Sequence, residues 1–97
     1  MKLVKNATVD KWLTGWAKAS IRAHDLDAAV DAATRKQAQG EAVAYARIFL
    51  DLAGGSYGRY WERFLTARNN RVAEIRDTYR AELETVAMHQ RRTTETP

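Results

Sequence analysis

The stretch GGSYGRYWERFLTARNNRVAEIRDTYRAELETVAMH, residues 54–89, decides the fold that this sequence predicts. After the glycines, apolar side chains recur every three or four residues, which is the spacing of one face of an α-helix. A helix over 57–89 would be roughly 48 Å long, longer than a small globule is wide. We therefore expect a second helix to lie along it. The apolar positions of the stripe are Tyr57, Trp61, Phe64, Leu65, Val72, Ile75, Tyr79, Leu83 and Val86.

The connection before this helix predicts how its neighbour runs. Gly54 and Gly55 can adopt the left-handed conformation that ends a helix, and Ser56 can cap the next one. A connection this short favours an antiparallel αα-hairpin with a preceding helix over 26–53. Within that helix, residues 43–52 are apolar on nearly all sides, which predicts burial against more than one neighbour.

The start and the middle of the 26–53 helix carry two further signals. Asp25 is the expected N-cap, because aspartate accepts hydrogen bonds from the first turn of a helix. Gly40 lies inside the pattern, where glycine costs about 1 kcal/mol relative to alanine. We expect one continuous helix with close helix–helix packing at Gly40, and a kink there is the alternative.

A first helix is predicted over 9–24, and it would cover the apolar surface that the hairpin leaves open. Trp12, Leu13 and Trp16 fall on one side of it, and two tryptophans one turn apart are typical of a docked helix. The apolar surface of residues 43–52 is their expected partner, which places this helix near the hinge end of the hairpin. The alternative, that this helix lies on a membrane interface with its lysines, leaves that apolar surface uncovered.

The sequence thus predicts an all-α fold with three helices, 9–24, 26–53 and 57–89, in one domain over 1–90. Residues 91–97 are polar and are expected to form a disordered tail. With no cysteine, no apolar run of membrane-spanning length and no signal-like start, we expect a soluble cytoplasmic protein.

A few polar residues interrupt the apolar stripes. Arg68 lies near the centre of the last stripe, and Gln37 and Glu41 interrupt the stripe of the middle helix. Folding the hairpin about residue 55 brings these positions within a turn of one another. They predict a polar layer in which Arg68 pairs with Glu41, and such layers set helix register at a cost in stability. The alternative leaves Arg68 open to an anionic ligand or a partner's carboxylate.

A second set of polar and aromatic residues points away from the predicted core of the last helix. Tyrosine and arginine at a surface are favoured in protein interfaces, and aromatic rings among basic side chains also suit single-stranded nucleic acids. A solvated surface with no partner is the plain alternative. The candidate partner-binding residues are Arg59, Tyr60, Arg63, Asn70 and Arg71.

No pattern in the chain predicts catalysis, a cofactor or a metal site. His24 and His89 are far apart, and no histidine or acidic ligand stands at the spacing that holds zinc. Ser20 and Ser56 have no evident base beside them. The glycines at 54–58 lack the lysine of a phosphate-binding loop. We expect no enzyme activity and no catalytic, cofactor-binding or metal-binding residues.

The remaining function classes all involve a macromolecular partner. The first expectation is a small protein-interaction module, an adaptor, regulator or inhibitor of a larger protein of the kind often encoded by mobile elements. The alternatives are a nucleic-acid-binding helical hairpin and a structural homodimer built as a helical bundle. The formal net charge of +4 is modest for a nucleic-acid-binding protein, and the middle helix carries an excess of acidic side chains.

Overall fold

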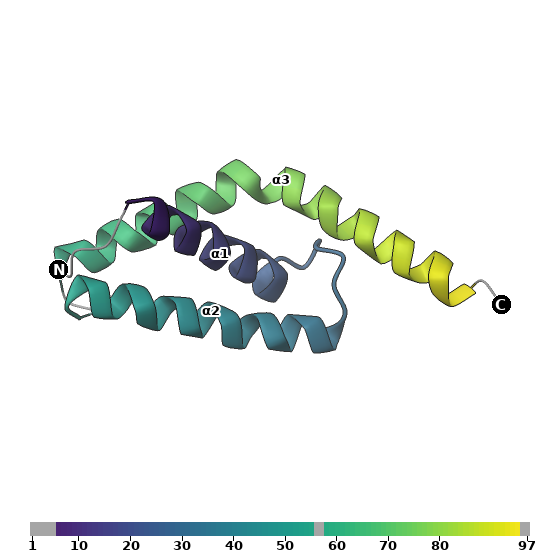
Figure 1. Ribbon diagram of the computed structural model, residues 1–97, viewed down its shortest axis with the longest axis horizontal. Helices are drawn as coiled ribbons and strands as arrows, with labels where there is room; N and C mark the ends of the chain where they lie inside the picture. Colours follow the sequence, from purple (N-terminus) through teal and green to yellow (C-terminus); the bar gives the residue numbers. More distant parts are fainter. Residues whose placement is uncertain (1–5, 56–57, 96–97) are drawn as a thin grey trace.

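The computed structural model describes residues 6–55 and 58–95, with side chains as far as residue 92. Three α-helices make up most of this part: α1 (Asn6–His24), α2 (Ala32–Ala53) and α3 (Arg59–Glu95). The described residues include no strand, which confirms the all-α class. α2 and α3 run in opposite directions from the connection at Gly54, as the hairpin prediction requires (Figure 1).

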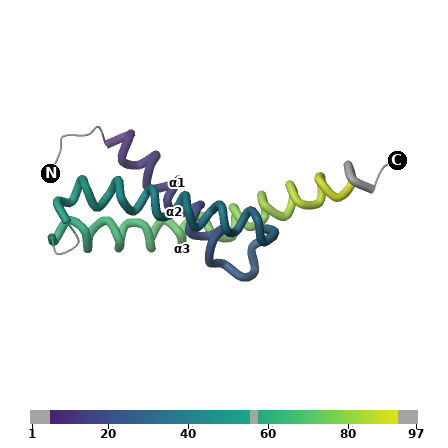
Figure 2. Tube along the Cα trace, turned by 90° about the horizontal axis from the view of Figure 1, so that it is seen from below, coloured from purple at the N-terminus to yellow at the C-terminus, as the bar shows by residue number. Residues whose placement is uncertain are grey.

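α1 lies across the space between the two arms of the hairpin. It packs extensively against both α2 and α3, whereas α2 and α3 contact each other over a short length. Figure 1 shows α1 starting near the Gly54 connection, which we call the hinge end, and running between α2 and α3. Away from the hinge end α2 and α3 diverge (Figure 1), and α3 continues alone past the other two helices (Figure 2). The predicted position of the first helix near the hinge end is confirmed.

The core at the hinge end is a cluster of four aromatic rings, Trp16, Phe49, Trp61 and Phe64. Trp16 and Phe49 are 2% and 0% exposed, and their ring centroids are 4.9 Å apart in a stacked arrangement. Trp61 lies 6.0 Å from Trp16, and Phe64 lies 4.9 Å from Phe49. Burying one such ring stabilises a fold by about 1.5–3 kcal/mol. This aromatic cluster therefore joins all three helices.

The opposite end of the bundle, which we call the distal end, has a smaller core. Ile21, Ala28 and Tyr79 are buried there, with Val72 and Leu83 packed against them. Past Leu83, α3 extends beyond the other helices (Figures 1 and 2). We call residues 81–95 the α3 overhang, and Val86 within it is 52% exposed.

The turn at the hinge end has the predicted conformation. Gly54 and Gly55 both have positive φ angles, 79° and 123°. The N–H of Gly54 donates to the carbonyl of Asp51 at 3.2 Å, and the N–H of Gly55 donates to that of Leu50 at 3.1 Å. These bonds satisfy carbonyls that the end of a helix leaves free, and glycine adopts the required φ without strain. The predicted cap Ser56 lies outside the described residues.

The N-terminus of α2 differs from the prediction. The cap is Asp31, whose carboxylate accepts from the N–H of Thr34 at 2.7 Å, and α2 begins at Ala32 rather than at 26. Asp25 has other partners, because its carboxylate accepts from the N–H of Asp27 and from Arg80. Residues 25–31 form a loop instead, and Leu26 is 88% exposed.

Close helix packing occurs at a different glycine from the one predicted. α2 continues through Gly40, and a Cβ placed at Gly40 would have no neighbouring atom within 4 Å. A Cβ at Gly15 would lie only 2.5 Å from Cζ of Tyr45. The close approach of α1 and α2 is therefore at Gly15, and Gly40 is neither a kink nor a contact.

The C-terminus of α3 also differs from the prediction. The helix continues to Glu95, so residues 91–95 of the expected disordered tail are helical. No proline interrupts this part of the chain, and the side chains are compatible with helix. Amphipathic spacing indicated where α3 packs against the bundle, but did not indicate where the helix ends.

Candidate functional site

The predicted polar layer between α2 and α3 is not formed. Arg68 donates to Oδ1 of Asn69 at 2.8 and 3.2 Å and lies over the ring of Trp16, 4.8 Å from its centroid. Within the described residues Arg68 has no ion pair, and Glu41 and the exposed Gln37 are not its partners. Because α1 lies between the arms of the hairpin, Arg68 meets α1 instead of α2. Burial of the guanidinium lowers the pKa of Arg68.

A polar link joins the three helices at Arg22. Arg22 of α1 donates to the hydroxyl of Tyr79 on α3 at 2.6 Å and forms a short ion pair with Glu41 of α2. Burial disfavours the charged guanidinium, but the hydrogen bonds and charges of Tyr79 and Glu41 raise the pKa of Arg22 overall. The charge of Glu41 is thus compensated within the fold.

The predicted partner-binding residues on α3 separate into two groups. Arg59, Tyr60, Arg63 and Asn70 are exposed. The guanidinium carbon of Arg63 lies 5.7 Å from the centroid of the Tyr60 ring, a cation–π contact on the surface. These four residues can meet a partner without rearrangement of the bundle.

Arg71 does not belong to that free surface. It donates to the hydroxyl of Thr14 at 2.5 Å and to the carboxylate of Asp10 at 2.6 Å, both on α1, and lies 3.3 Å from Glu74. The hydrogen bond to Asp10 is the main cause of a raised pKa at Arg71. Arg71 therefore attaches the start of α1 to α3, and its role in partner binding stays a prediction.

A groove between α1 and α2 leaves apolar surface open to a partner. It has a volume of about 490 Å³, and its floor includes Trp12 and Gly15 of α1 and Ala44, Tyr45 and Ile48 of α2. A shallow hollow on the outer side of α2 continues this surface, because Ala44 and Ile48 line both. Together they make one surface, which we call the α1–α2 groove.

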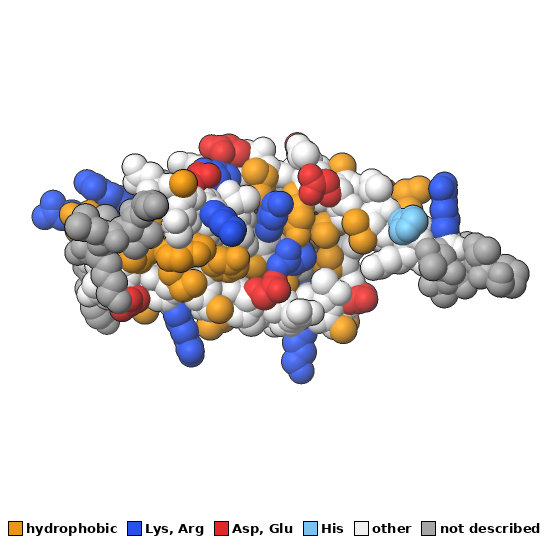
Figure 3. Space-filling view, in the orientation of Figure 1, with side chains coloured by type: hydrophobic (Ala, Val, Ile, Leu, Met, Phe, Trp, Pro, Cys, Tyr) orange, Lys and Arg blue, Asp and Glu red, His pale blue; other side chains and the backbone are white. Residues whose placement is uncertain are grey.

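Basic side chains border the α1–α2 groove on both sides. Lys11 and Lys18 line it from α1, and Lys36 and Arg47 line it from α2. Figure 3 shows hydrophobic side chains gathered between these helices, with Lys and Arg side chains above and below them. Glu41 also lines the groove, but Arg22 compensates its charge. The groove therefore combines an apolar floor with positively charged rims.

The sequence contained part of the signal for this groove. The nearly continuous apolar surface of residues 43–52 predicted contact with more than one neighbour, and Ala44 and Ile48 do remain at the surface. Gly15 was the missed residue. Its missing side chain lets Tyr45 approach α1, and only the crossing of α1 over α2 shows this.

The part of the chain that the structure describes gives no basis for a metal site or a membrane-spanning helix. No group of three His, Asp or Glu side chains there is arranged to hold a metal ion. None of the helices in that part has the length and hydropathy needed to cross a bilayer. Comparisons with protein-family models, with curated proteins and with solved structures find no match to this chain.

Proposed function

We propose that this protein is a small protein-interaction module that binds a larger protein, as an adaptor, regulator or inhibitor, through the α1–α2 groove. The observation that carries the proposal is the exposed apolar floor of the groove, bordered on both sides by lysine and arginine. Exposed apolar surface bordered by polar residues is typical of protein interaction sites.

The shape of the groove favours a helix as the bound element. Two packed helices form a furrow in which the ridge of a third can lie, with its apolar side chains directed inward. The small side chain of Ala44 leaves room for large side chains of the partner, and Trp12 and Ile48 offer apolar contact. An amphipathic helix with apolar residues at i, i+3, i+4 and i+7 fits this requirement.

The rims favour acidic residues on the two flanks of that helix. Lys11, Lys36 and Arg47 are exposed, so each can meet a carboxylate without losing an internal partner. Lys18 is half-buried, with its ammonium 5.2 Å from the centroid of the Tyr79 ring. Complementary charges of this kind contribute mainly to the association rate and to the choice of partner.

Nucleic acid is the alternative partner, and the apolar floor argues against it. Phosphate contacts require cations but no apolar surface, and their affinity falls steeply with salt. A gel shift with duplex and single-stranded probes at two salt concentrations separates the alternatives. Strong, salt-sensitive binding to these probes that Lys36→Glu abolishes would mean that the partner is a nucleic acid and not a protein.

The direct test is selection from a library of helical peptides displayed on phage, with the whole chain immobilised. Recovered peptides are expected to carry an apolar stripe at helical spacing, flanked by Asp and Glu. Each peptide is then measured against the Ile48→Glu variant, which places a carboxylate on the floor of the groove. We expect at least tenfold weaker binding, because the charge loses hydration against apolar contacts.

Two control variants define the outcome. Met88→Glu changes an exposed apolar residue of α3 that does not line the groove, and it is expected to leave peptide affinity unchanged. A double variant, Tyr60→Ala with Arg63→Ala, tests the surface predicted from sequence alone. If peptide binding were lost in the double variant and kept in Ile48→Glu, the partner would bind at α3 and the α1–α2 groove would be the wrong site.

A further inference from the structure

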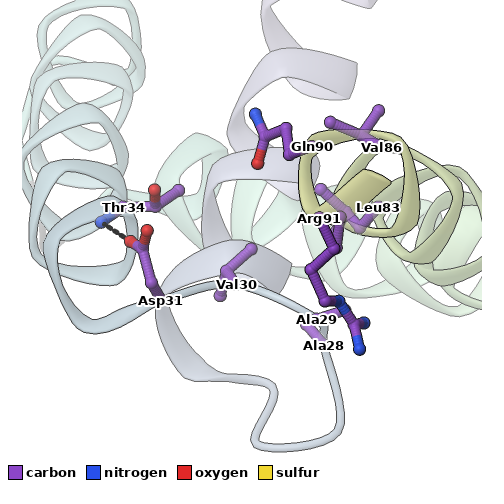
Figure 4. Close-up of a pocket in the computed structure, with 10 residues that line it drawn as sticks. Ala28, Ala29, Val30, Asp31, Thr34, Leu83, Val86, Gln90 and Arg91 are labelled. Carbon is purple, nitrogen blue, oxygen red and sulfur yellow. Dashed lines mark hydrogen bonds between the residues drawn. The ribbon is translucent and has the colours of Figure 1, made fainter. Parts of the chain in front are cut away.

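A second groove lies at the distal end, independent of the α1–α2 groove. It has a volume of about 560 Å³ and is formed by the loop after α1, the first turn of α2 and the α3 overhang. Figure 4 shows Arg91 of α3 extending toward Ala28 and Ala29 of the loop, and Leu83, Val86 and Gln90 line the groove from the same helix. We call this the distal groove. Its loop wall consists of Ala28, Ala29 and Val30 and ends at the carboxylate of Asp31.

One wall of this groove is the α3 overhang, whose Leu83 packs against the distal core and whose later residues have no described helix beside them. The α3 overhang extends past α1 and α2 (Figures 1 and 2), and its apolar stripe continues through Val86 and Ala87. Val86 is 52% exposed, although it stands two turns after Tyr79, which is 8% exposed. An apolar helical stripe in water is stabilised when another helix packs on it.

The charged side chains beside the stripe are placed so that two copies of this helix can complement each other. Glu84 and Arg91 are both exposed and stand seven residues apart, two helical turns, so they lie on the same flank of α3. When two identical helices pack antiparallel about a two-fold axis, residues on the same flank meet across the interface. With the axis near residue 87, Glu84 of each copy faces Arg91 of the other. Two equivalent ion pairs result.

The same register brings the apolar parts together. Val86 and Ala87 of one copy then lie beside Ala87 and Val86 of the other, next to the axis. Val86 and Ala87 also line the distal groove, so an overhang packed on them would lie against that groove. Each copy therefore contributes its α3 overhang to the interface and contacts the overhang of the other copy. This is the condition for a closed two-fold dimer.

From these relations we propose that the distal groove binds the α3 overhang of a second copy of this chain, forming an antiparallel homodimer. The two-fold axis passes near Ala87, with the Glu84–Arg91 pairs on its flanks. The α1–α2 groove remains free in this arrangement, because it is lined by α1 and α2 alone. A dimer would present two such grooves to a larger partner.

The test is the mass of the protein in solution across a concentration series, by sedimentation equilibrium. The natural chain is expected to approach the mass of two chains as concentration rises. Glu84→Arg and Arg91→Glu each place like charges across the axis twice, and each is expected to weaken dimerisation about tenfold or more. The combined variant Glu84→Arg with Arg91→Glu restores opposite charges and is expected to recover the dimer.

Glu62→Arg is the matched control, because it is an equal charge reversal at an exposed position of α3 near the hinge end. The dimer affinity of this variant should stay within about twofold of that of the natural chain. Circular dichroism verifies that each variant retains its helices. A natural chain with the mass of one copy at every concentration overturns the proposal. So does a dimer that the single reversals leave unchanged, or one that the combined variant fails to restore.

Discussion

The two ends of this small bundle are held together by different chemistry. At the hinge end, three helices meet around aromatic rings, of which the stacked Trp16 and Phe49 have almost no exposed surface. At the distal end, the apolar core is smaller, and arginines connect the elements. The difference shows where each function can reside. A closed aromatic core can carry stability, while uncovered helix surface, such as that of the α3 overhang, is free to bind.

The distal connections involve three arginines with partners on different elements. Arg22 links α1 to Tyr79 and Glu41. Arg80 of α3 lies 2.6 Å from the carboxylate of Asp25 in the loop, and Arg35 of α2 donates to the carbonyl of Asp25 at 3.1 Å. Ion pairs with partial exposure contribute about 1 kcal/mol or less each. The distal end should therefore open more readily than the hinge end.

The largest expected effect is loss of the central ring at the hinge end. Trp16→Ala removes the side chain that contacts Phe49, Trp61 and Arg68, and should lower the free energy of unfolding by about 3–5 kcal/mol. Urea unfolding followed by circular dichroism measures it. Trp12→Ala, at a half-buried position, is the matched comparison and should cost clearly less. Equal costs would remove the distinction between a closed core and an open groove.

The next effect belongs to the polar link of the distal end. Arg22→Met should lower the free energy of unfolding by about 1–2 kcal/mol, since Tyr79 and Glu41 lose a charged donor in a partly exposed setting. Urea unfolding of Arg22→Met, Glu41→Gln and the double variant forms a double-mutant cycle. Lys36→Met, on the exposed surface of α2, is the control. Additive costs for Arg22 and Glu41 would mean that the two residues do not interact.

A smaller effect is expected from the cap that begins α2. Asp31→Ala should cost about 1 kcal/mol, because the N–H of Thr34 loses its acceptor. Thermal unfolding provides the measurement, with Asp27→Ala in the exposed loop as the control. If Asp27→Ala and Asp31→Ala were equally costly, α2 would not begin where the structure places it.

The smallest effect is a dependence of the distal end on pH. Desolvation opposes ionisation of Asp25, but the hydrogen bond and charge of Arg80 and the N–H of Asp27 lower its pKa overall. A carboxylate with a lowered pKa stabilises the fold above its unfolded pKa of about 4, and this contribution is lost as pH falls through the folded value. We expect a loss of about 1 kcal/mol or less.

Hydrogen-exchange protection factors measured at falling pH localise this effect. Amides near Asp25 and Arg80 should lose protection before those around Trp16, and Asp25→Asn should remove the difference. Protection lost equally at both ends would contradict a separate acid-sensitive region.

The sequence predicted the parts of this fold that depend on local chemistry. Helical periodicity indicated three helices, and the glycine pair predicted the turn at Gly54, because these signals act between neighbours in the chain. The predicted start of α2 was wrong because Asp25 and Asp31 are equally good N-caps by sequence alone. Only the contact of Asp25 with Arg80, 55 residues away, distinguishes them.

The polar contacts could not be predicted from the same signals. The Arg68–Glu41 pair followed from a hairpin whose arms touch along their length, whereas α1 fills that space and Arg68 meets Trp16. Arg22 and Arg71 were judged by their positions on single helices, and their partners on other helices depend on how the helices cross. The exposed positions of Arg59, Tyr60 and Arg63 agree with the pattern, and their role in binding stays a prediction.

The position of α1 between the two arms is the central claim, and nuclear Overhauser effects from the Trp16 indole test it most directly. The structure predicts contacts from this ring to Phe49 on α2 and to Trp61 on α3, with Arg68 side-chain resonances shifted upfield by the ring. A hairpin closed directly on itself would instead give contacts between Arg68 and Glu41. Observation of that pair, without the Trp16 contacts, would contradict the arrangement of the helices and the α1–α2 groove that depends on it.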